Sequence, residues 1–408
     1  MALRRSATPS VLPSFPWVGL LTLAGAIFVS VTSEFLPTGL LPDMAHDLGV
    51  SVATTGLLVT VFAGAVVAAT TPLTALTRRF SRKRLVVVVM VTIALANLLA
   101  AVAPNYGVLV GARLLGGAAH GLFWGVVASY PAYLVSGKQL GRAIALTAAG
   151  ASAAFVLGIP LGSALGHLLT WRAAFATIAG LVVLLAAVVA AFLPPAQHRV
   201  PLATGEIPLP LRKDPTIRGV VMLCVVIVTV ATGHNVFYTY IAPWLIESAS
   251  VPASAIPVLL FLFGGAGVLG LALAGVAADR FPALGFAVMI LAMMGSVLAL
   301  AASAGSFPVV VVAFVVLGVA FGGVPAMLQT GMLRTASPRA RGLAGALQVT
   351  SFNAGIGVGA MIGAVLIGTA GLGVLPLAEL VLLAVGLVLS FAPQAVRLRA
   401  RRLALSAN

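Results

Sequence analysis

Runs of apolar residues, each long enough to form a membrane-spanning helix, follow one another along almost the whole chain. A helix of about 20 apolar residues crosses a hydrocarbon layer of roughly 30 Å. The runs are continuous, whereas the strands of a membrane barrel would alternate polar and apolar residues, so helices are predicted. The pattern predicts twelve spans, at residues 17–42, 52–76, 85–103, 107–134, 141–168, 172–193, 219–246, 254–277, 284–304, 308–335, 341–368 and 374–393.

The composition excludes an ordinary soluble protein. Hydrophobic residues make up 61% and charged residues only 8% of the 408 positions. Soluble domains hold roughly 25% charged residues and could not hide this much apolar surface. The predicted fold class is therefore an all-α membrane protein that lies in a lipid bilayer.

The net charge of +15 raises the question of a nucleic-acid partner, and the distribution of the charge answers it. If the N-terminus lies inside, all of the 23 Lys and Arg residues except Arg113 and Arg172 fall on the cytoplasmic side. The positive-inside rule describes this asymmetry, and attraction to anionic lipid accounts for the excess charge. We therefore expect both termini in the cytoplasm and no nucleic-acid partner.

The sequence repeats itself at an offset of 201 residues. At this offset Pro42 aligns with Pro243 and Arg79 with Arg280, and several glycines also coincide. Each repeat holds six predicted spans, and parallel repeats are related by a pseudo-twofold axis along the membrane normal, with a substrate cavity between them. A proline-rich segment separates the repeats. The predicted domains are a six-helix bundle at 1–193, a cytoplasmic linker at 194–218 and a second six-helix bundle at 219–408.

Three stretches of the first half carry a family resemblance: SEFLPTGLLPDMAHDLGVS at 33–51, GARLLGGAAHG at 111–121 and LGIPLGSALG at 157–166. They resemble the first helix, the fourth-helix motif and a loose fifth-helix antiport motif of the major facilitator superfamily. The likeness is to its twelve-helix drug/proton antiporter branch, with the chloramphenicol exporters and arabinose-efflux-like permeases. The resemblance implies the major facilitator fold, alternating access, and a place in the bacterial cytoplasmic membrane, where we expect a monomer.

The cytoplasmic motif between the second and third spans departs from the family pattern. The family's GxxxDRxGRR stands here as TALTRRFSRK, with Arg78 where an aspartate is usual. The second-half copy, GVAADRF at 275–281, keeps Asp279 and Arg280. The resemblance therefore implies a cytoplasmic gate that involves Asp279 and Arg280, with Arg142 as a further gating residue.

Two charged residues stand at a similar depth inside the predicted spans. Glu34 lies roughly 12 Å below the outer end of the first span, and Arg113 roughly 10 Å below the outer end of the fourth, at about 1.5 Å per helical residue. In the implied fold both helices line the central cavity, so we expect the two groups to face it and interact. A charge at this depth costs roughly 2.5 to 3.5 kcal/mol, and this favours a proton-coupling pair over a fixed ion pair that only orients two helices.

Polar side chains on the apolar spans predict a substrate site. Their imidazole, indole, amide and hydroxyl groups could orient a polar-decorated substrate in an apolar cavity. A buried histidine can equally be a neutral contact between helices, and both interpretations stay open. Glu379 is expected to snorkel towards the membrane interface. We expect substrate contacts from His120, Trp124, His234, Asn235, Tyr238, Gln329 and Asn353.

Glycines recur at four-residue spacing on the fifth and eleventh spans, and they include Gly158, Gly162, Gly359 and Gly363. Small residues at this spacing let helix backbones approach closely. We expect these glycines at a sliding interface between the two bundles, although close packing inside a bundle predicts the same pattern.

The predicted function is secondary transport, with a proton-coupled efflux antiporter of a small drug-like or sugar-like compound as the leading hypothesis. Proton-driven uptake is the alternative, followed by a membrane-embedded enzyme or a passive channel. The motifs HExxH and GxxxxGK[ST] are absent from the sequence, so neither a metalloprotease nor an ATP-driven pump is predicted. We expect no enzyme activity, no metal and no cofactor, with the proton as the coupling ion.

Overall fold

The computed structural model describes residues 15–77, 79–135, 139–196, 214–303, 305–337 and 340–406. Within these ranges every regular element is helical, and twelve segments are long and apolar enough to cross a membrane. The predicted spans are confirmed, with ends that differ by a few residues. The chain is therefore a multi-pass all-α membrane protein.

Twelve spans arise from more than twelve helices, because several spans are broken. The first half holds α1 (Trp17–Phe35), the 3-10 turn η1 (Leu36–Gly39), α2 (Leu41–Leu48), α3 (Val52–Leu76), α4 (Arg82–Ala101), α5 (Tyr106–Val127), α6 (Pro131–Leu134), α7 (Leu140–Ala153), the π-helical turn η3 (Ala154–Gly158), α8 (Ile159–Leu168) and α9 (Trp171–Phe192). The second half holds α10 (Ile217–Tyr238), α11 (Ile241–Glu247), η5 (Ala253–Ala255), α12 (Ile256–Arg280), α13 (Pro282–Ala301), α14 (Phe307–Thr335), α15 (Arg341–Ala370), η6 (Leu372–Val374) and α16 (Leu375–Ser406).

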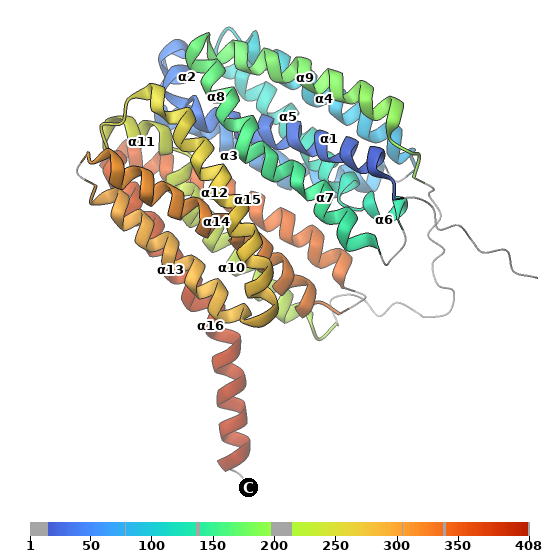
Figure 1. The fold of residues 1–408 in the computed structure, drawn as a ribbon, viewed down its shortest axis with the longest axis vertical. Helices are drawn as coiled ribbons and strands as arrows, with labels where there is room; N and C mark the ends of the chain where they lie inside the picture. Colours follow the sequence, from blue (N-terminus) through green and yellow to red (C-terminus); the bar gives the residue numbers. More distant parts are fainter. Residues whose placement is uncertain are drawn as a thin grey trace, which may run out of the picture.

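The helices pack into two six-helix bundles, which Figure 1 shows side by side. Buried apolar side chains form one core in the first bundle, between Leu23 and Leu193. A second core runs mainly between Val220 and Leu383. Most of the predicted linker, residues 197–213, lies outside the described residues, and the proposed domain limits stay a prediction.

The internal repeat is visible in where the helices begin. α5 and α14 begin at Tyr106 and Phe307, and α7 and α15 at Leu140 and Arg341. Both pairs are separated by the offset of 201 found in the sequence. The repeat in the sequence is therefore a repeat of structure, with the same order of helices in each bundle.

The first and seventh spans are not single helices to residues 42 and 246, and these two predictions are wrong at their ends. α1 stops at Phe35 and continues through η1 into α2, while α10 stops at Tyr238 before α11. Pro37 in η1 has no N–H with which to continue the ladder of α1. The two breaks occupy equivalent places in the repeat, so each bundle has an interrupted helix beside the cavity.

The fifth span contains a π-helical turn, η3, between α7 and α8. Pro160, the second residue of α8, cannot donate to the carbonyl of Val156 four residues before it, and its ring also needs room there. A π turn holds one residue more than an α-helical turn, and the wider turn gives the proline ring room. Such turns are frequent at functional sites. The turn places Phe155 on the cavity wall.

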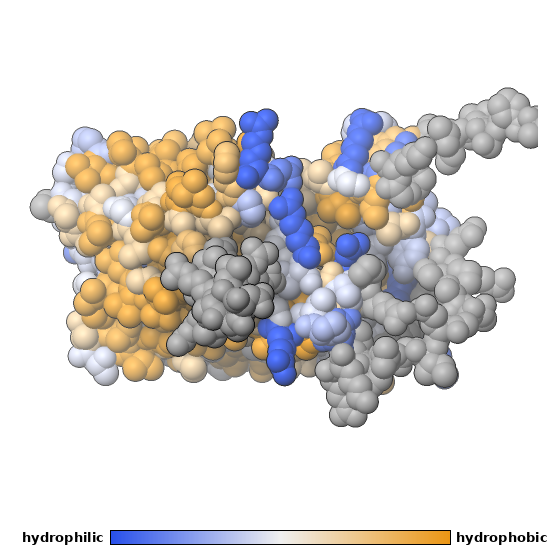
Figure 2. Space-filling model, turned by 90° about the horizontal axis from the view of Figure 1, so that it is seen from below, coloured by the Kyte–Doolittle hydropathy of each residue, from blue (hydrophilic) through white to orange (hydrophobic). Residues whose placement is uncertain are grey.

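The two ends of the molecule carry opposite charge. We call one the basic end, after the exposed Arg79, Arg84, Arg142, Arg280 and Arg334, and the other the acidic end, after Asp43, Asp47 and Glu247. Exposed apolar side chains cover the flanks between them. Figure 2 shows this apolar surface in orange, with long basic side chains gathered towards one end.

The bundles touch along two seams. On the first, α3 meets α15, and the Thr60 hydroxyl donates to the carbonyl of Gly357 at 2.9 Å. On the second, α12 meets η3, and Gly264 lies against the backbone of Phe155. The contact is so close that any side chain at position 264 would overlap this backbone. Leu260 packs close to Gly39 nearer the acidic end. The seams close the acidic half of the molecule.

The glycines predicted for the interface between the bundles lie inside the bundles. Gly158 and Gly162 pack against α1 and η1, whereas Gly359 and Gly363 pack against α10 and the turn that follows it. Each gives room for a neighbouring backbone or side chain of its own bundle. The placement corrects the prediction of a sliding interface and corresponds to ordinary close packing.

Candidate functional site

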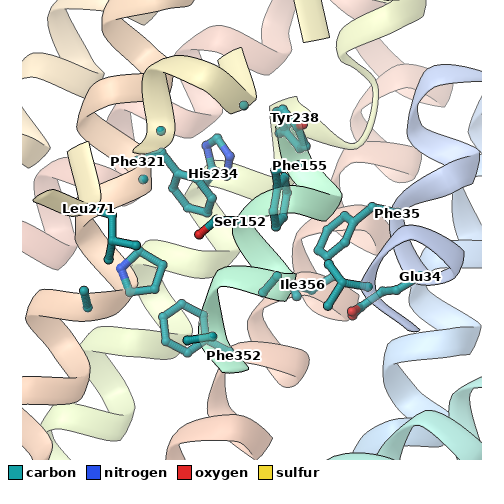
Figure 3. Close-up of a pocket in the computed structure, with 18 of the residues that line it drawn as sticks. Glu34, Phe35, Ser152, Phe155, His234, Tyr238, Leu271, Phe321, Phe352 and Ile356 are labelled. Atoms are coloured by element: carbon teal, nitrogen blue, oxygen red, sulfur yellow. The ribbon is translucent and has the colours of Figure 1, made fainter. Parts of the chain in front are cut away.

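A cavity of about 400 Å³ lies between the two bundles and is lined by helices of both. Its deep wall includes the buried residues Glu34, His120 and His234, whereas Ala148 and Gln329, closer to the basic end, are exposed. The cavity is therefore closed towards the acidic end and opens towards the basic end. Figure 3 shows Glu34 and His234 on opposite sides of this space.

Glu34 is the acidic group of the cavity, at the end of α1, and its partner is His120 of α5. Its Oε2 lies 3.2 Å from Nε2 of His120, and both side chains are buried. The same nitrogen accepts the indole N–H of Trp124 at 2.8 Å. The other ring nitrogen, Nδ1, lies 2.8 Å from the hydroxyl of Ser30. Four side chains from two helices thus form one hydrogen-bonded group.

Arg113 is buried beside this group but holds the backbone instead of the Glu34 carboxyl group. Its guanidinium donates to the carbonyls of Ser33 at 3.0 Å and Glu34 at 2.8 Å. The carbonyl of Ser33 needs an outside donor, because its normal partner four residues on is Pro37, which has no N–H. The guanidinium also lies 4.0 Å from the ring centre of Phe62, at cation–π distance. The predicted contact between the two charged groups is therefore replaced by bonds from Arg113 to the main chain, and Arg113 is not among the residues that line the cavity, so the expectation that it faces the cavity is wrong.

Ser33 connects this end of α1 to the neighbouring helix α4. Its hydroxyl and the side-chain amide of Asn97 lie at hydrogen-bond distance, 2.8 Å for Nδ2 and 3.0 Å for Oδ1. Asn97 also donates to the carbonyl of Ile93. The break in the first span is thus held from two sides, by Arg113 and by Asn97, so the position of Glu34 is fixed.

The second bundle holds another buried acid, Glu379 of α16, with His234 of α10. Nδ1 of His234 lies 3.2 Å from Oε1 of Glu379, and the side chain of Glu379 is fully buried. The expectation that Glu379 snorkels to the interface is wrong, because its carboxyl group points to α10 inside the bundle. Neither the other oxygen of Glu379 nor Nε2 of His234 has a hydrogen-bond partner among the described residues.

All of the residues predicted to contact substrate line this one cavity. Besides the two histidines and Trp124, these are Asn235, Tyr238, Gln329 and Asn353. Asn235 and Asn353 each donate to a carbonyl of their own helix, and the Oδ1 of Asn353 has no partner among the described residues. Apolar rings and glycines form the rest of the wall, so a few polar groups face a mainly apolar space.

The family model of the Major Facilitator Superfamily matches residues 23–360, which span most of both bundles. The chain belongs to the major facilitator superfamily. Its fold, with two six-helix bundles around a central cavity, is that of a transporter. A major facilitator protein is not an enzyme, so the alternative of a membrane-embedded enzyme is set aside.

Similar proteins include transporters of several kinds. A protein of Helicobacter pylori (strain G27), named "Probable sugar efflux transporter", is 32% identical over 348 residues, which cover 85% of this chain and 87% of that protein. A second strain of Helicobacter pylori has a protein of the same name with the same identity and coverage. These relatives share the family and nearly the full length with this major facilitator protein.

Two solved structures share the major facilitator fold at low identity. A bacterial homologue of the human lysosomal transporter Spinster, inward-facing and occupied, has a TM-score of 0.71 and 15% identity, covering 95% of this chain and 97% of that chain. The nucleoside transporter NupG has a TM-score of 0.69 and 14% identity, covering 92% and 98%. At these identities the likeness concerns the fold alone.

The residues predicted to gate this major facilitator protein lie at the basic end, with Asp279 and Arg280 adjacent on α12 and Arg142 on α7. Asp279 pairs with Arg334 at the end of α14, 2.7 Å between the charged atoms. Arg142 lies 4.6 Å from the ring centres of both Phe15 and Trp17. No ion pair or hydrogen bond joins Asp279 and Arg142 among the described residues, and Arg280 is exposed. Arg78, which replaces the usual aspartate, lies outside the described residues.

Sequence reasoning missed three features of the site. The partner of Glu34, His120, was placed in the substrate site, and Glu379 was placed at the interface. Arg334 was not linked to Asp279 either. Each of these pairs joins helices that are distant in the chain, so only the packing of the bundles shows which side chains meet. The many polar groups on α5 and α10 were the one sign in the sequence that these helices take part in polar pairs.

Proposed function

We propose that this major facilitator protein exports a small sugar-like compound in exchange for protons by alternating access. The observation that carries the proposal is the balance of donors and acceptors around Glu34. The Glu34 carboxyl group lies on the wall of the cavity, beside the imidazole of His120, which is also bonded to the indole of Trp124.

Nε2 of His120 accepts the indole N–H of Trp124, so it carries no hydrogen of its own. A neutral imidazole then has its hydrogen on Nδ1, where it donates to Ser30. The oxygen of Glu34 also lies 3.2 Å from Nε2, where a carboxylate oxygen would face the nitrogen lone pair, whereas a carboxyl group that brings a hydrogen can share that lone pair with the indole N–H. The contacts therefore support a proton held on Glu34 in this conformation.

Loss of that proton changes which conformation is favourable. A carboxylate in this buried place would face a nitrogen lone pair and would lack a donor, and an unpaired buried charge is costly. The ionised form is favoured where water or the hydroxyl groups of a substrate reach Glu34. Proton occupancy and substrate occupancy thereby bias the same two-state equilibrium of the bundles.

A sugar-like substrate fits the lining of the cavity. Amide and imidazole groups alternate with aromatic rings, so hydroxyl groups and an apolar ring face could both be contacted. The two Helicobacter pylori relatives are named for sugar efflux. A cavity of about 400 Å³ is within the range of small-molecule sites, which begins at roughly 300 Å³.

The direction of transport is proposed from the charge distribution and the fifth span. If the basic end faces the cytoplasm by the positive-inside rule, the cavity of this conformation opens to the cytoplasm, where an exported compound would bind. The stretch at 157–166, which resembles the antiport motif, contains the last two residues of the π turn and most of α8. A symporter would load the same cavity with proton and solute together.

Purified protein in liposomes separates these functions. A lumen more acidic than the bath drives solute inward by antiport, and a more alkaline lumen drives it inward by symport. We expect an acidic lumen to accumulate a radiolabelled thiogalactoside, by up to about tenfold per pH unit for each proton exchanged. Accumulation with the alkaline lumen, or none with either, would contradict the proposal. Accumulation of chloramphenicol but not of the thiogalactoside would replace the sugar-like substrate by a drug-like one.

A further inference from the structure

The second bundle contains an acid–base pair that the role of Glu34 does not use. His234 and Glu379 meet at 3.2 Å between α10 and α16, and their side chains are 1% and 0% exposed. Each keeps one polar atom without a hydrogen-bond partner among the described residues, Nε2 of His234 and Oε2 of Glu379. Two unsatisfied atoms in one buried pair need an explanation beyond a simple helix contact.

The surroundings of the pair cannot stabilise a separated charge. The imidazole ring stacks on Phe321 with 3.7 Å between ring centres, and on Tyr238 with 4.9 Å. Phe263 of α12 lies parallel to it at 6.2 Å. Among the described residues that contact the pair, Tyr238 is the other ionisable group, and α12 and α14 present phenylalanine rings. An ionised Glu379 in this apolar box would be poorly compensated.

The imidazole is the part of the pair that lies at the cavity wall. His234 lines the transport cavity, whereas Glu379 does not. Since Nδ1 faces Glu379, Nε2 is the ring nitrogen outside that contact, and in this conformation it is buried without a hydrogen-bond partner among the described residues. Figure 3 shows the ring of His234 at the cavity beside Phe321, while Glu34 lies across from it. A proton that reaches Glu379 from the cavity must therefore pass through the imidazole.

We propose that His234 and Glu379 form a second proton-binding site, in the C-terminal bundle, which is loaded from the cavity through Nε2 of His234. In the unloaded pair a neutral imidazole donates its Nδ1 hydrogen to the Glu379 carboxylate. A proton from cavity water then binds Nε2, and the Nδ1 proton moves to Oε1 of Glu379. The product is a protonated Glu379 and a neutral imidazole with its hydrogen on Nε2, and release is the reverse.

The consequence for the cycle concerns both bundles. Each bundle then holds one buried Glu–His pair, Glu34 with His120 and Glu379 with His234, and closing the cavity is favourable when both carboxyl groups are protonated. As a coupling site the second pair rests on the proposed proton-coupled function. As a proton-binding site it does not, and the experiment measures proton binding without transport.

Infrared spectroscopy of the full-length protein in lipid nanodiscs tests the proposal directly. A protonated buried carboxyl group has a C=O stretching band that shifts when its hydrogen is replaced by deuterium. We expect a carboxylic acid band at neutral pH that is absent in Glu379→Gln and retained in Glu34→Gln. In His234→Phe we expect the deuterium exchange of this band to slow by about a hundredfold, because the relay is lost.

Two results would overturn the proposal. One is the absence of any band that depends on Glu379, which would mean that the acid is never protonated. The other is equal exchange in the wild type and in His234→Phe, which would make the pair a structural contact only. If Glu379→Gln does not fold, Glu379→Asp serves, since the shorter acid keeps the proton but moves the band. Failure of pH-driven transport in the wild type would refute the proposed function and leave this band unaffected.

Discussion

At the scale of single residues, the position of Glu34 depends on what Arg113 binds. A proline at position 37 removes the N–H that would satisfy the carbonyl of Ser33, and Arg113 supplies the missing donor. The guanidinium thus keeps α1 ended at the place where Glu34 faces His120. Arg113 acts on the proton-binding group through the backbone, as a positioning residue.

Arg113→Ala is expected to destabilise the protein and to weaken coupling. It removes two charge-assisted hydrogen bonds, each of about 1.5–3 kcal/mol, and leaves buried carbonyls without a donor. Thermal unfolding in detergent, followed by tryptophan fluorescence, should show a clearly lower melting temperature than in the wild type. Arg84→Ala is the control, because Arg84 is an exposed arginine at the basic end. Equal loss of stability in both variants would contradict the role of Arg113.

At the scale of elements, the spans were predictable and their interruptions were not. Apolar run length placed all twelve spans, because a bilayer imposes one length on each helix. It could not place the ends of α1 and α10, since the residues after both breaks are as apolar as those before them. Pro37 and Pro160 marked two of the interruptions in the sequence, yet a proline in a membrane helix is compatible with a kink, a π turn or an end.

The contact between α3 and α15 is expected to set how easily the acidic end opens. Thr60→Val removes the hydrogen bond to Gly357 and should destabilise the closed state by about 1 kcal/mol, a roughly fivefold change in population. Maleimide labelling of a cysteine at Leu260, in a Cys224→Ala background, measures this opening. Thr229→Val is the matched control, because that hydroxyl bonds within its own helix. Slower or unchanged labelling in Thr60→Val would contradict the assignment of the seam.

The link between α2 and α9 at the acidic end is expected to depend on pH. Hydrogen bonds from Arg172 and then Trp171 lower the pKa of Asp47 below its usual value. A lowered pKa contributes stability above the unfolded value, about 3.9, and this contribution is lost as the pH falls through the folded pKa below it. Asp47→Asn should therefore lower the melting temperature at neutral pH, with a difference that shrinks below about pH 4. A constant difference over the whole range would contradict this link.

At the scale of the whole molecule, the sequence repeat predicted the two-bundle architecture, whereas the acid–histidine pairs are visible only in the packing of the helices. The offset of 201 identified two equivalent bundles, because proline and loop arginines kept one register. It could not show that Glu379 turns inward, since α16 has no counterpart acid at the equivalent position, Ile178. The four-residue spacing of the glycines assigned Gly158 and Gly359 to the wrong surface, because small residues permit close approach without showing which helix approaches.

The whole-molecule claim is that protonation of Glu34 is coupled to the movement of the two bundles. Glu34→Gln keeps the shape and can donate an amide hydrogen to His120, so it imitates the protonated acid permanently. Such a variant should still exchange labelled for unlabelled solute at equal pH on both sides. It should lose only the part of the pH-driven solute accumulation that the exchange of one proton provides.

The most direct measurement is the accumulation of thiogalactoside in liposomes at several imposed pH differences, for the wild type, Glu34→Gln and the exposed control Glu247→Gln. The logarithm of the accumulation ratio plotted against the pH difference has a slope that counts the protons exchanged per solute. The account predicts that the slope falls by one in Glu34→Gln and stays at the wild-type value in Glu247→Gln. An unchanged slope in Glu34→Gln, with solute exchange intact, would contradict it.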